Sequence, residues 1–552
     1  MSMSKKSLFA GVGAAVMIAS VLAGCGSSSG SSSGGSSESK ADSSSASSSE
    51  ASSAASSSST ASASTGGDKI LRVGELWAID GIGTIGHDST LAKEKLMLVE
   101  TLVEVNENFG LKPGLAKSWK NTDENTWVFE LQEGVKFHDG TDMDAEAVKF
   151  CLDTCFKNDP THATKCYVDK VEATGKNQIT IHTSKPYAEL PEYMHSSSLA
   201  IFAKSCVNSD GSMKENTIIG TGPFKLEKFD VATGSVDTVR FDDYWGTPTT
   251  LDGVHMVGLT DANTRAMALE NNEVDFTCDL PFNQVDTLDA LDNVYVESYD
   301  TARIYQATLN LDTAFFSDKN VRQAISYAID RDTIAKETLY GTTTPAKGIF
   351  NDSMAWSNQD IKGYAYDKDK AVKMLTDAGW TDSDGDGILD KDGQKFEFTI
   401  YTYPDRPGLP LIAEAIQAQL KDINVKVNIV TEDYSAIDKD IESGKEWGMN
   451  LAGNATAMIP SCYDYLNKQF RSSDGGYSNA EVDKLLDEAA GEFDTAKRYE
   501  LSKKIQEIIV DDCPKLFICN YGVSYGFNSK VSNFRFNPTA HDYQFNTDIT
   551  IS

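Results

Sequence analysis

The composition of the chain changes sharply near residue 67, and this change limits which part can fold. Residues 26–67 are almost wholly Ser, Gly, Ala and Thr. Such a segment cannot bury enough apolar surface to offset the entropy lost on ordering. We therefore expect residues 25–67 to form a disordered tether with a random-coil reach of roughly 35 Å. Any folded core must come from the rest of the 552-residue chain. The part after residue 67 is long enough for about three domains of ordinary size.

A secretion signal precedes the tether. Lys5 and Lys6 stand before an apolar stretch at residues 8–23. This stretch is shorter than the ~20 residues that a membrane-spanning helix needs, and no later segment of the sequence is apolar enough to span. Residues 1–24 are therefore predicted to be a signal peptide.

The end of the signal points to a lipid anchor. The tetrad Leu22-Ala23-Gly24-Cys25 resembles the bacterial lipobox, in which the cysteine becomes the lipidated first residue of the mature protein. An ordinary cleaved signal that ends near a cysteine is the alternative. With the tether that follows, the resemblance implies a protein anchored through Cys25 on the outer face of the cytoplasmic membrane, in a Gram-positive bacterium.

The charge balance excludes one class of partner. The chain carries 82 acidic and 50 basic residues, a formal net charge of −32, with a pI of about 4.6. A protein this acidic repels the phosphate backbone, so we expect no nucleic-acid binding.

Eight cysteines remain once Cys25 is set aside. An even number in an exported protein permits disulfides, but the sequence cannot choose their pairing. No histidine or further cysteine completes a zinc spacing around Cys151 and Cys155, so buried thiols or disulfides are expected in place of a metal site. The eight are Cys151, Cys155, Cys166, Cys206, Cys278, Cys462, Cys513 and Cys519.

Strand and helix patterns alternate along the folded part. Residues 254–259 and 274–276 read as strands on either side of a helix capped by Asp261. Ser317 and Asp367 are expected to cap two later helices, and Gly379 to end the second of them. Further helices are predicted at residues 411–420, 480–490 and 495–510. The alternation predicts an α/β fold with mostly parallel sheets covered by helices.

Catalytic motifs are scarce, so we expect no enzyme. The Ser residues flanked by Gly lie in the tether, where no strand-turn-helix elbow can form. No His-x-x-x-His pair exists for a zinc hydrolase. His138 follows a strand and precedes Gly140 in a turn, and is expected to be a turn histidine.

One acidic loop has the spacing of a calcium site. Asp382, Asp384, Asp386 and Asp390 occupy loop positions 1, 3, 5 and 9. Position 12, where a bidentate Glu is usual, is Gly393, so any binding should be weak. The alternative is a solvated acidic turn. We expect no required cofactor and at most a structural calcium ion.

Ordered sequence blocks resemble those of the family 5 extracellular solute-binding proteins, the oligopeptide-, dipeptide- and nickel-binding components of ABC importers. The resemblance runs from about residue 68 to the C-terminus. The blocks that carry it include Leu115-Ala116-Lys117-Ser118-Trp119, Gly134-Val135-Lys136-Phe137-His138-Asp139-Gly140, Gly220-Thr221-Gly222-Pro223-Phe224, Tyr244-Trp245-Gly246, Val321-Arg322-Gln323-Ala324-Ile325 and Ala378-Gly379-Trp380.

This resemblance implies the periplasmic-binding-protein-like fold of type II, cluster C, with mixed sheets. Two α/β lobes, joined by two crossings, would close on a ligand in the cleft between them. Carried onto this chain, lobe I is residues 68–302 plus 514–552, and lobe II is residues 303–513.

The resemblance also suggests how a solute is held. Arg406, in Tyr403-Pro404-Asp405-Arg406-Pro407, matches the Arg-Pro of dipeptide-binding relatives, where the arginine grips the peptide carboxylate through a bidentate contact. The loop at residues 452–463 lacks the Asp that would pair with the peptide amine. The expected cleft walls combine aromatic packing with hydrogen bonding, and they are Trp77, Trp356, Asn454, Thr456 and Tyr463.

We therefore expect a monomeric, lipid-anchored receptor that hands a peptide-like solute to an ABC permease. One alternative is a nickel-chelate receptor on the same scaffold, favoured by residues 261–267 and 340–342 and by His87 on an early cleft loop. The absence of an Arg near residues 199–203 weakens it. A further alternative is a calcium-dependent surface adhesin or enzyme. The ligand, the permease and any disulfide pairing are left open.

Cys25 is predicted to carry the anchor. Labelled palmitate should enter the wild-type protein and not Cys25→Ala, because the thiol is the predicted acylation site. Gel analysis of the labelled protein checks this, with Cys206→Ala as a control that should label like the wild type. Equal labelling of wild type and Cys25→Ala would end the lipoprotein hypothesis.

Overall fold

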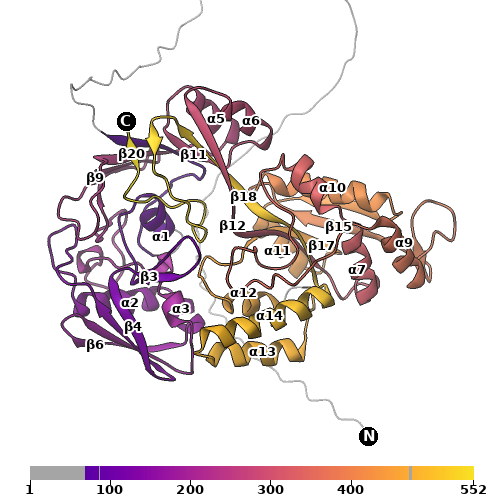
Figure 1. Ribbon diagram of the computed structural model, residues 1–552, viewed down its shortest axis with the longest axis horizontal. Helices are drawn as coiled ribbons and strands as arrows, with labels where there is room; N and C mark the ends of the chain where they lie inside the picture. Colours follow the sequence, from indigo (N-terminus) through magenta and orange to yellow (C-terminus); the bar gives the residue numbers. More distant parts are fainter. Residues whose placement is uncertain (1–68, 86–87, 472–474) are drawn as a thin grey trace, which may run out of the picture. The chain divides into compact units, whose positions relative to one another are not determined.

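A ten-stranded mixed sheet organises the computed structural model, which describes residues 69–85, 88–471 and 475–552 (Figure 1). The predicted signal peptide, tether and Cys25, and also His87, lie outside the described residues. The strands run in the order β16-β15-β17-β12-β18-β11-β1-β10-β9-β8. Their bounds are β1 Ile70–Glu75, β8 Phe224–Asp230, β9 Ser235–Arg240, β10 Gly253–Gly258, β11 Phe276–Cys278, β12 Val294–Leu309, β15 Glu397–Thr402, β16 Lys426–Thr431, β17 Met449–Ala455 and β18 Lys515–Asn528.

The sheet mixes two pairing directions. β1 pairs in parallel with β10 and β11, and β15 pairs in parallel with β16 and β17. The pairs β8·β9, β9·β10, β11·β18, β12·β17 and β12·β18 are antiparallel. The mixed sheet implied by the family resemblance is confirmed, and the mostly parallel sheet expected from simple alternation is wrong. Returning long strands and a hairpin supply the antiparallel pairs, which helix-strand alternation does not reveal.

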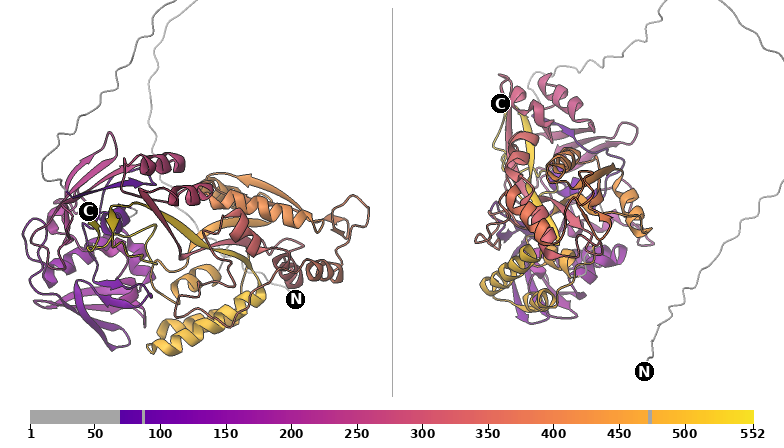
Figure 2. Two further views of the ribbon diagram at one scale, coloured as in Figure 1. Left: turned by 45° about the horizontal axis from the view of Figure 1, so that its top comes forward. Right: turned by 90° about the vertical axis from the view of Figure 1, so that its right-hand side faces the viewer.

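β12 and β18 connect the two halves of the sheet. They pair from Val294 opposite Asn528 to Thr308 opposite Lys515, and Figure 2 shows β18 in yellow passing between the halves. β12 is continuous through Asp300 and Tyr305, on either side of the lobe boundary expected at residue 302. Its register against β18 shifts between Asp300 and Ile304, so the strand is irregular at this point. The lobe boundaries at 302 and 514 stay a prediction.

A second, antiparallel sheet has the order β4-β5-β7-β6. Helix α2, Ala145–Asn158, packs on β6 and β7 of this sheet. Its start is fixed by Asp144, whose side chain accepts a hydrogen bond from the Ala147 N–H. The strands are β4 Ala116–Asp123, β5 Thr126–Leu131, β6 Val168–Gly175 and β7 Gln178–Thr183. Two-stranded antiparallel sheets pair β2 Val103–Val105 with β3 Leu111–Pro113, β13 Asp390–Lys391 with β14 Gln394–Lys395, and β19 Val531–Ser532 with β20 Thr550–Ile551.

Most predicted helix caps hold. Asp261 and Asp367 accept hydrogen bonds at the starts of α5 and α9, but Asp318 caps α7 in place of Ser317, because its carboxylate accepts from the Asn320 N–H. Gly379 follows α9 with a φ of 90°, the left-handed conformation that favours glycine. No helix in the described part of the chain is long and apolar enough to cross a membrane. The remaining bounds are α1 Asp88–Thr90, α3 Pro160–Lys165, α4 Leu190–Tyr193, α5 Ala262–Glu270, α6 Val285–Asp289, α7 Lys319–Tyr327, α8 Arg331–Thr333, α9 Lys368–Asp377, α10 Gly408–Lys421, α11 Tyr434–Glu442, α12 Asp464–Phe470, α13 Ala480–Gly491 and α14 Thr495–Asp512.

Two large hydrophobic clusters form the core. One lies against the ten-stranded sheet and includes Val73, Phe276 and Ile400. The other joins the second sheet to the segment around α12–α14 and includes Phe129 and Cys462. All eight cysteines after Cys25 are buried free thiols. The sequence left buried thiols and disulfides open, and the structure has the thiols.

Buried charges join Glu189, just before α4, to Arg498 on α14. Glu189 accepts hydrogen bonds from Arg498 Nε at 3.1 Å, from the Cys462 N–H and from the Ser461 hydroxyl. Arg498 Nη2 donates to Glu192 Oε1 at 3.2 Å, while Glu192 Oε2 is buried and has no hydrogen-bond partner among the described residues. Burial and the nearby Glu189 carboxylate raise the pKa of Glu192 to about 8. The ionised form of Glu192 is therefore the least well stabilised charge in this cluster.

Glu192 should make stability fall as pH rises. Its folded pKa lies above the ordinary value of 4.5, so its stabilising protonation is complete below 4.5 and is lost as pH rises through about 8. Glu192→Gln should therefore raise the free energy of unfolding by about 1–3 kcal/mol at pH 8.5, and much less at pH 4.5. Denaturant unfolding at the two pH values measures this difference.

Glu189→Gln is the matched control for this experiment. It should destabilise the protein at both pH values, because it leaves Arg498 without its main buried partner. An equal effect of Glu192→Gln at pH 4.5 and 8.5 would contradict the assignment.

Candidate ligand-binding site

A cluster of buried charges gathers around one carboxylate near the C-terminus. The Asp542 side chain is 2% exposed and contacts nitrogen atoms from widely separated segments. Burial opposes its ionisation, but the charges of Lys95 and Arg406 and the hydrogen bond with His541 hold the pKa of Asp542 well below its usual range. The five contacts are Trp77 Nε1 at 2.9 Å, Lys95 Nζ at 3.2 Å, Arg303 Nη1 at 3.2 Å, Arg406 Nη1 at 3.2 Å and His541 Nδ1 at 2.8 Å.

The end of β1 supplies a second carboxylate to this cluster. Glu75 accepts from Lys95 Nζ at 2.6 Å and from the Tyr543 hydroxyl at 2.5 Å. Lys95 therefore bridges Glu75 and Asp542, and all three side chains are buried. Both carboxylates have a close cation, so the polar atoms in this part of the cluster are well satisfied. These contacts fix the backbone near Trp77.

Arg406 reaches the cluster from the loop between β15 and α10. Its Nη1 lies 3.2 Å from Asp542 Oδ1, 3.5 Å from the Tyr521 hydroxyl and 3.9 Å from Asp279 Oδ2. Its guanidinium also faces the Trp77 ring at 5.1 Å from the ring centre, within cation–π range. Within the described residues every hydrogen bond and ion pair of the Arg406 side chain uses Nη1, and this side chain is 11% exposed. Nε and Nη2 thus have donor capacity for a ligand.

The structure brings two of the predicted contacts together and separates others. Trp77 and Arg406 meet at Asp542. Asn454, on β17, is half-buried and lies opposite Ile304. Thr456 is buried, and both its N–H and its hydroxyl donate to the Ala302 carbonyl.

Trp356 and Tyr463 lie in the second hydrophobic cluster. Trp356 is fully buried and packs edge-on against Phe109 and Phe350, with its Nε1 unpartnered. Tyr463 is buried and its ring meets that of Tyr187. Their role as ligand contacts stays a prediction, as does that of His87.

Several residues at this site carry no local sequence signal. They approach one another only because the sheet brings distant segments together, so neither spacing nor motif marks them. A cavity of about 140 Å³ lies beside them, lined in part by Trp77, Lys95 and His541. Burial lowers the pKa of His541 to about 4, so its imidazole is neutral at pH 7. The residues missed from sequence are Lys95, Asp279, Arg303, Tyr521, His541 and Asp542.

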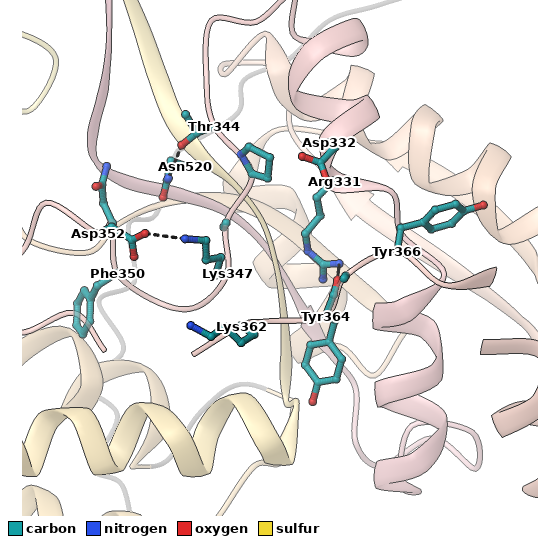
Figure 3. A pocket seen from close by; sticks show the side chains of 14 residues that line it. Arg331, Asp332, Thr344, Lys347, Phe350, Asp352, Lys362, Tyr364, Tyr366 and Asn520 are labelled. Carbon is teal, nitrogen blue, oxygen red and sulfur yellow. Dashed lines mark hydrogen bonds and ion pairs between the residues drawn. The ribbon is translucent and has the colours of Figure 1, made fainter. Parts of the chain in front are cut away.

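A larger cavity of about 510 Å³ lies elsewhere and shares no lining residue with this cluster (Figure 3). Two of its three cationic side chains, Arg331 and Lys347, are already engaged. Lys347 pairs with Asp352 at 2.9 Å, and Arg331 donates to the main-chain carbonyls of Phe517 and Tyr364. Because Arg331 braces the backbone, we favour the Asp542 cluster as the candidate site.

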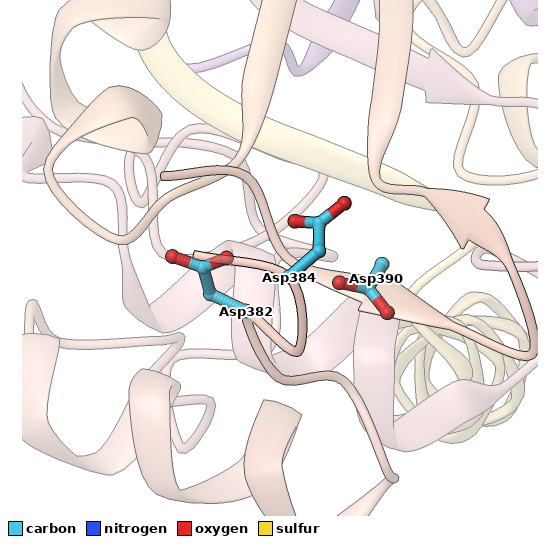
Figure 4. A group of neighbouring side chains, drawn as sticks. All are labelled: Asp382, Asp384 and Asp390. Atoms are coloured by element: carbon cyan, nitrogen blue, oxygen red, sulfur yellow. The ribbon is translucent and has the colours of Figure 1, made fainter. Parts of the chain in front are cut away.

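The predicted calcium loop brings three of its four carboxylates together (Figure 4). One oxygen each from Asp382, Asp384 and Asp390 lie within 4.8 Å of one another, and Asp386 is outside this group. The Lys395 ammonium lies 2.6 Å from Asp384 Oδ2 and 3.0 Å from Asp386 Oδ2. A lysine thus supplies the positive charge that a cation would bring, and calcium binding stays a prediction.

Comparison with known proteins identifies related receptors. Residues 110–477 match the model for "Bacterial extracellular solute-binding proteins, family 5 Middle". The nickel-binding protein NikA of Staphylococcus aureus is 26% identical over 451 residues, covering 80% of this chain and 87% of the relative. The glutathione-binding protein GsiB of Escherichia coli is 27% identical over 432 residues, covering 75% and 81%.

A third relative has a solved complex. The oligopeptide-binding protein AppA of Bacillus subtilis is 27% identical over 494 residues, covering 86% of this chain and 90% of the relative. Its structure with a nonapeptide aligns with a TM-score of 0.68 at 25% identity, covering 86% of this chain and 97% of that one. The family and the two-lobed α/β fold expected from the sequence are confirmed.

Calcium, if bound, should act on stability alone. It should raise the melting temperature through mass action and leave solute affinity unchanged. Lys395→Met should strengthen the calcium effect, because the ammonium no longer competes for Asp384 and Asp386. Thermal melts with calcium, and with magnesium as the control cation, measure this. Loss of solute binding on adding a chelator, with the fold intact, would contradict it.

Proposed function

The chain belongs to family 5 of the bacterial extracellular solute-binding proteins, and we propose that it captures a peptide-like solute for an ABC importer. Members of this family are transport receptors and not enzymes. The solute would bind at Arg406, between the predicted lobes. Closure of the lobes would then be driven by contacts that the solute makes to both of them.

Arg406 carries this proposal. A guanidinium with unused Nε and Nη2 donors can hold a carboxylate in a bidentate geometry. Its Nη1 contact to Asp542 and its stacking on Trp77 fix the orientation of the fork before a ligand arrives. Two relatives, the oligopeptide-binding protein AppA and the glutathione-binding protein GsiB, support a peptide-like ligand.

Delivery is the second part of the proposal. The lipobox at residues 22–25 and the Ser-rich tether would hold a monomeric receptor close to its permease on the outer face of the cytoplasmic membrane. A short flexible tether raises the effective concentration of the receptor at the membrane surface.

A nickel chelate is the alternative ligand. The related nickel-binding protein NikA of Staphylococcus aureus supports this alternative. The position of His541 also favours it. Its imidazole lines the 140 Å³ cavity beside Trp77 and is neutral at pH 7, which is the form that binds metals. His87, outside the described residues, remains a second candidate.

The mass of the natural ligand would separate these alternatives. Native mass spectrometry of protein purified from its own cells should show a metal-free peptide-like adduct. A nickel isotope pattern in the adduct would favour the chelate.

Arg406→Ala should weaken binding of a carboxylate solute by about 2–5 kcal/mol, because the desolvated anion loses its partner. Arg406→Lys should recover only part, since an ammonium lacks the two-pronged geometry. Calorimetric titration with a short-peptide library checks both. The control is Arg535→Ala, which removes an exposed arginine paired with Asp548. Unchanged affinity in Arg406→Ala would rule out the carboxylate clamp.

A further inference from the structure

Asp279 occupies a fixed position directly after β11. Its φ is 55°, and its N–H donates to the Ser524 carbonyl at 2.9 Å. Arg265 then clamps the corner, with Nη2 on the Asp279 carbonyl at 2.8 Å and Nε on the Cys278 carbonyl at 3.0 Å. Every hydrogen bond of Arg265 goes to a main-chain carbonyl. The backbone that presents the Asp279 carboxylate is therefore rigid.

The Asp279 carboxylate is underused for a buried charge. Its side chain is 8% exposed, yet within the described residues its contacts are the Tyr521 hydroxyl at 3.5 Å and Arg406 Nη1 at 3.9 Å. A carboxylate can accept about four hydrogen bonds, and Asp542 next to it has five close nitrogen contacts. Burial raises the pKa of Asp279. Burying this charge destabilises the fold, and the carboxylate gains little hydrogen bonding to offset the lost hydration. Such uncompensated burial is typical of functional sites.

Arg406 faces Asp279 with its own unused donors. A purely anionic ligand on Arg406 would bring a second negative charge close to Asp279, which like-charge repulsion disfavours. A ligand that carries an ammonium next to its carboxylate would satisfy both residues at once. Asp542 cannot take this ammonium, because its oxygens are already contacted by Trp77, Lys95 and Arg303.

The separation of the pair limits the spacing of the ligand charges. Arg406 Nη1 lies 3.9 Å from Asp279 Oδ2, and Nε and Nη2 are bonded to the same guanidinium carbon as Nη1. The donors left for a carboxylate are therefore close to the Asp279 carboxylate, which suits an ammonium and a carboxylate borne by one carbon. In a linear peptide the terminal charges are at least one residue spacing, about 3.8 Å, further apart. Such a peptide would have to pull Arg406 away from Asp279.

We propose that the site binds an α-amino-acid head group, with Asp279 accepting its ammonium while Arg406 holds its carboxylate. This inference rests on the proposed solute-binding function and narrows its ligand class. The head group occurs in free amino acids, in γ-glutamyl peptides and in amino-acid chelates of metals, and an experiment must separate these sources.

Two isomeric ligands give the sharpest test. γ-Glu-Ala and α-Glu-Ala have the same composition and net charge, but only the γ isomer bears its ammonium and a carboxylate on one carbon. Calorimetry on the wild-type protein should show the γ isomer binding at least about tenfold more tightly. N-acetylation of the γ isomer should remove this advantage. Titration with free glutamate, with and without Ni²⁺, separates the amino-acid and chelate sources.

Asp279→Asn, combined with N-acetylation of the ligand, completes a thermodynamic cycle that tests whether Asp279 contacts the ammonium. In this variant N-acetylation should have little further effect, because the ammonium has already lost its partner. The variant should fold, since removing a buried charge with a raised pKa does not cost stability, and a thermal melt verifies this. Asp286→Asn, an exposed neighbour on α6, is the control and should behave like the wild type.

The outcomes are distinguishable. If the wild type binds these ligands but prefers the α isomer, or if the effects of N-acetylation and Asp279→Asn are additive, the Asp279 inference is overturned and the proposed function stands. If the wild type binds no amino acid, peptide or chelate in any arm, the proposed function fails and the inference falls with it.

Discussion

The buried carboxylate of Asp542 is the contact on which the arrangement of the site depends. It joins the loop after β1 through Trp77, the connecting strand β12 through Arg303, and the loop before α10 through Arg406. Removing one partner of such a buried pair typically costs about 3–5 kcal/mol, because the other charge is left uncompensated. The junction therefore fixes the position of the Arg406 guanidinium and of the Trp77 ring before any solute binds.

Groups close to this junction differ in how well their polar atoms are satisfied. Glu75 and Lys95 form short, buried contacts and hold the wall in place. In the part of the chain that the structure describes, Asp279 has two long contacts and Arg303 has a buried Nη2 without a partner. Well-satisfied groups stabilise the scaffold, whereas underused ones keep the capacity to bind a ligand, at some cost to the fold. This difference is the reason for proposing that the solute binds on the Arg406 side of Asp542.

The sequence predicted features that depend on local contacts. Asp261 and Asp367 cap their helices because the accepting oxygen and the donating N–H lie within three residues. It also placed Arg406 and Trp77 at one site, though through a family resemblance and not through spacing. The continuous strand β12 was missed, because its pairing with β18 joins segments far apart in the chain, which no local pattern records.

The rest of the site was beyond sequence reasoning for the same cause. Lys95 and Asp542 are 447 residues apart, and Arg406 and Asp542 are 136 apart. Trp356 was chosen as a large aromatic near the predicted cleft; it is fully buried against other rings, and its ligand contact stays a prediction. An isolated Asp, Lys or Trp in a sequence does not reveal whether its side chain contacts a ligand, an ion-pair partner or the hydrophobic core.

A crystal structure of the protein with its bound solute would test the central claim most directly. It should show the solute carboxylate within hydrogen-bond distance of Arg406 Nε and Nη2, with Nη1 still on Asp542 and the solute ammonium on Asp279. A solute bound away from Arg406, or one that displaces Asp542 from it, would contradict the account.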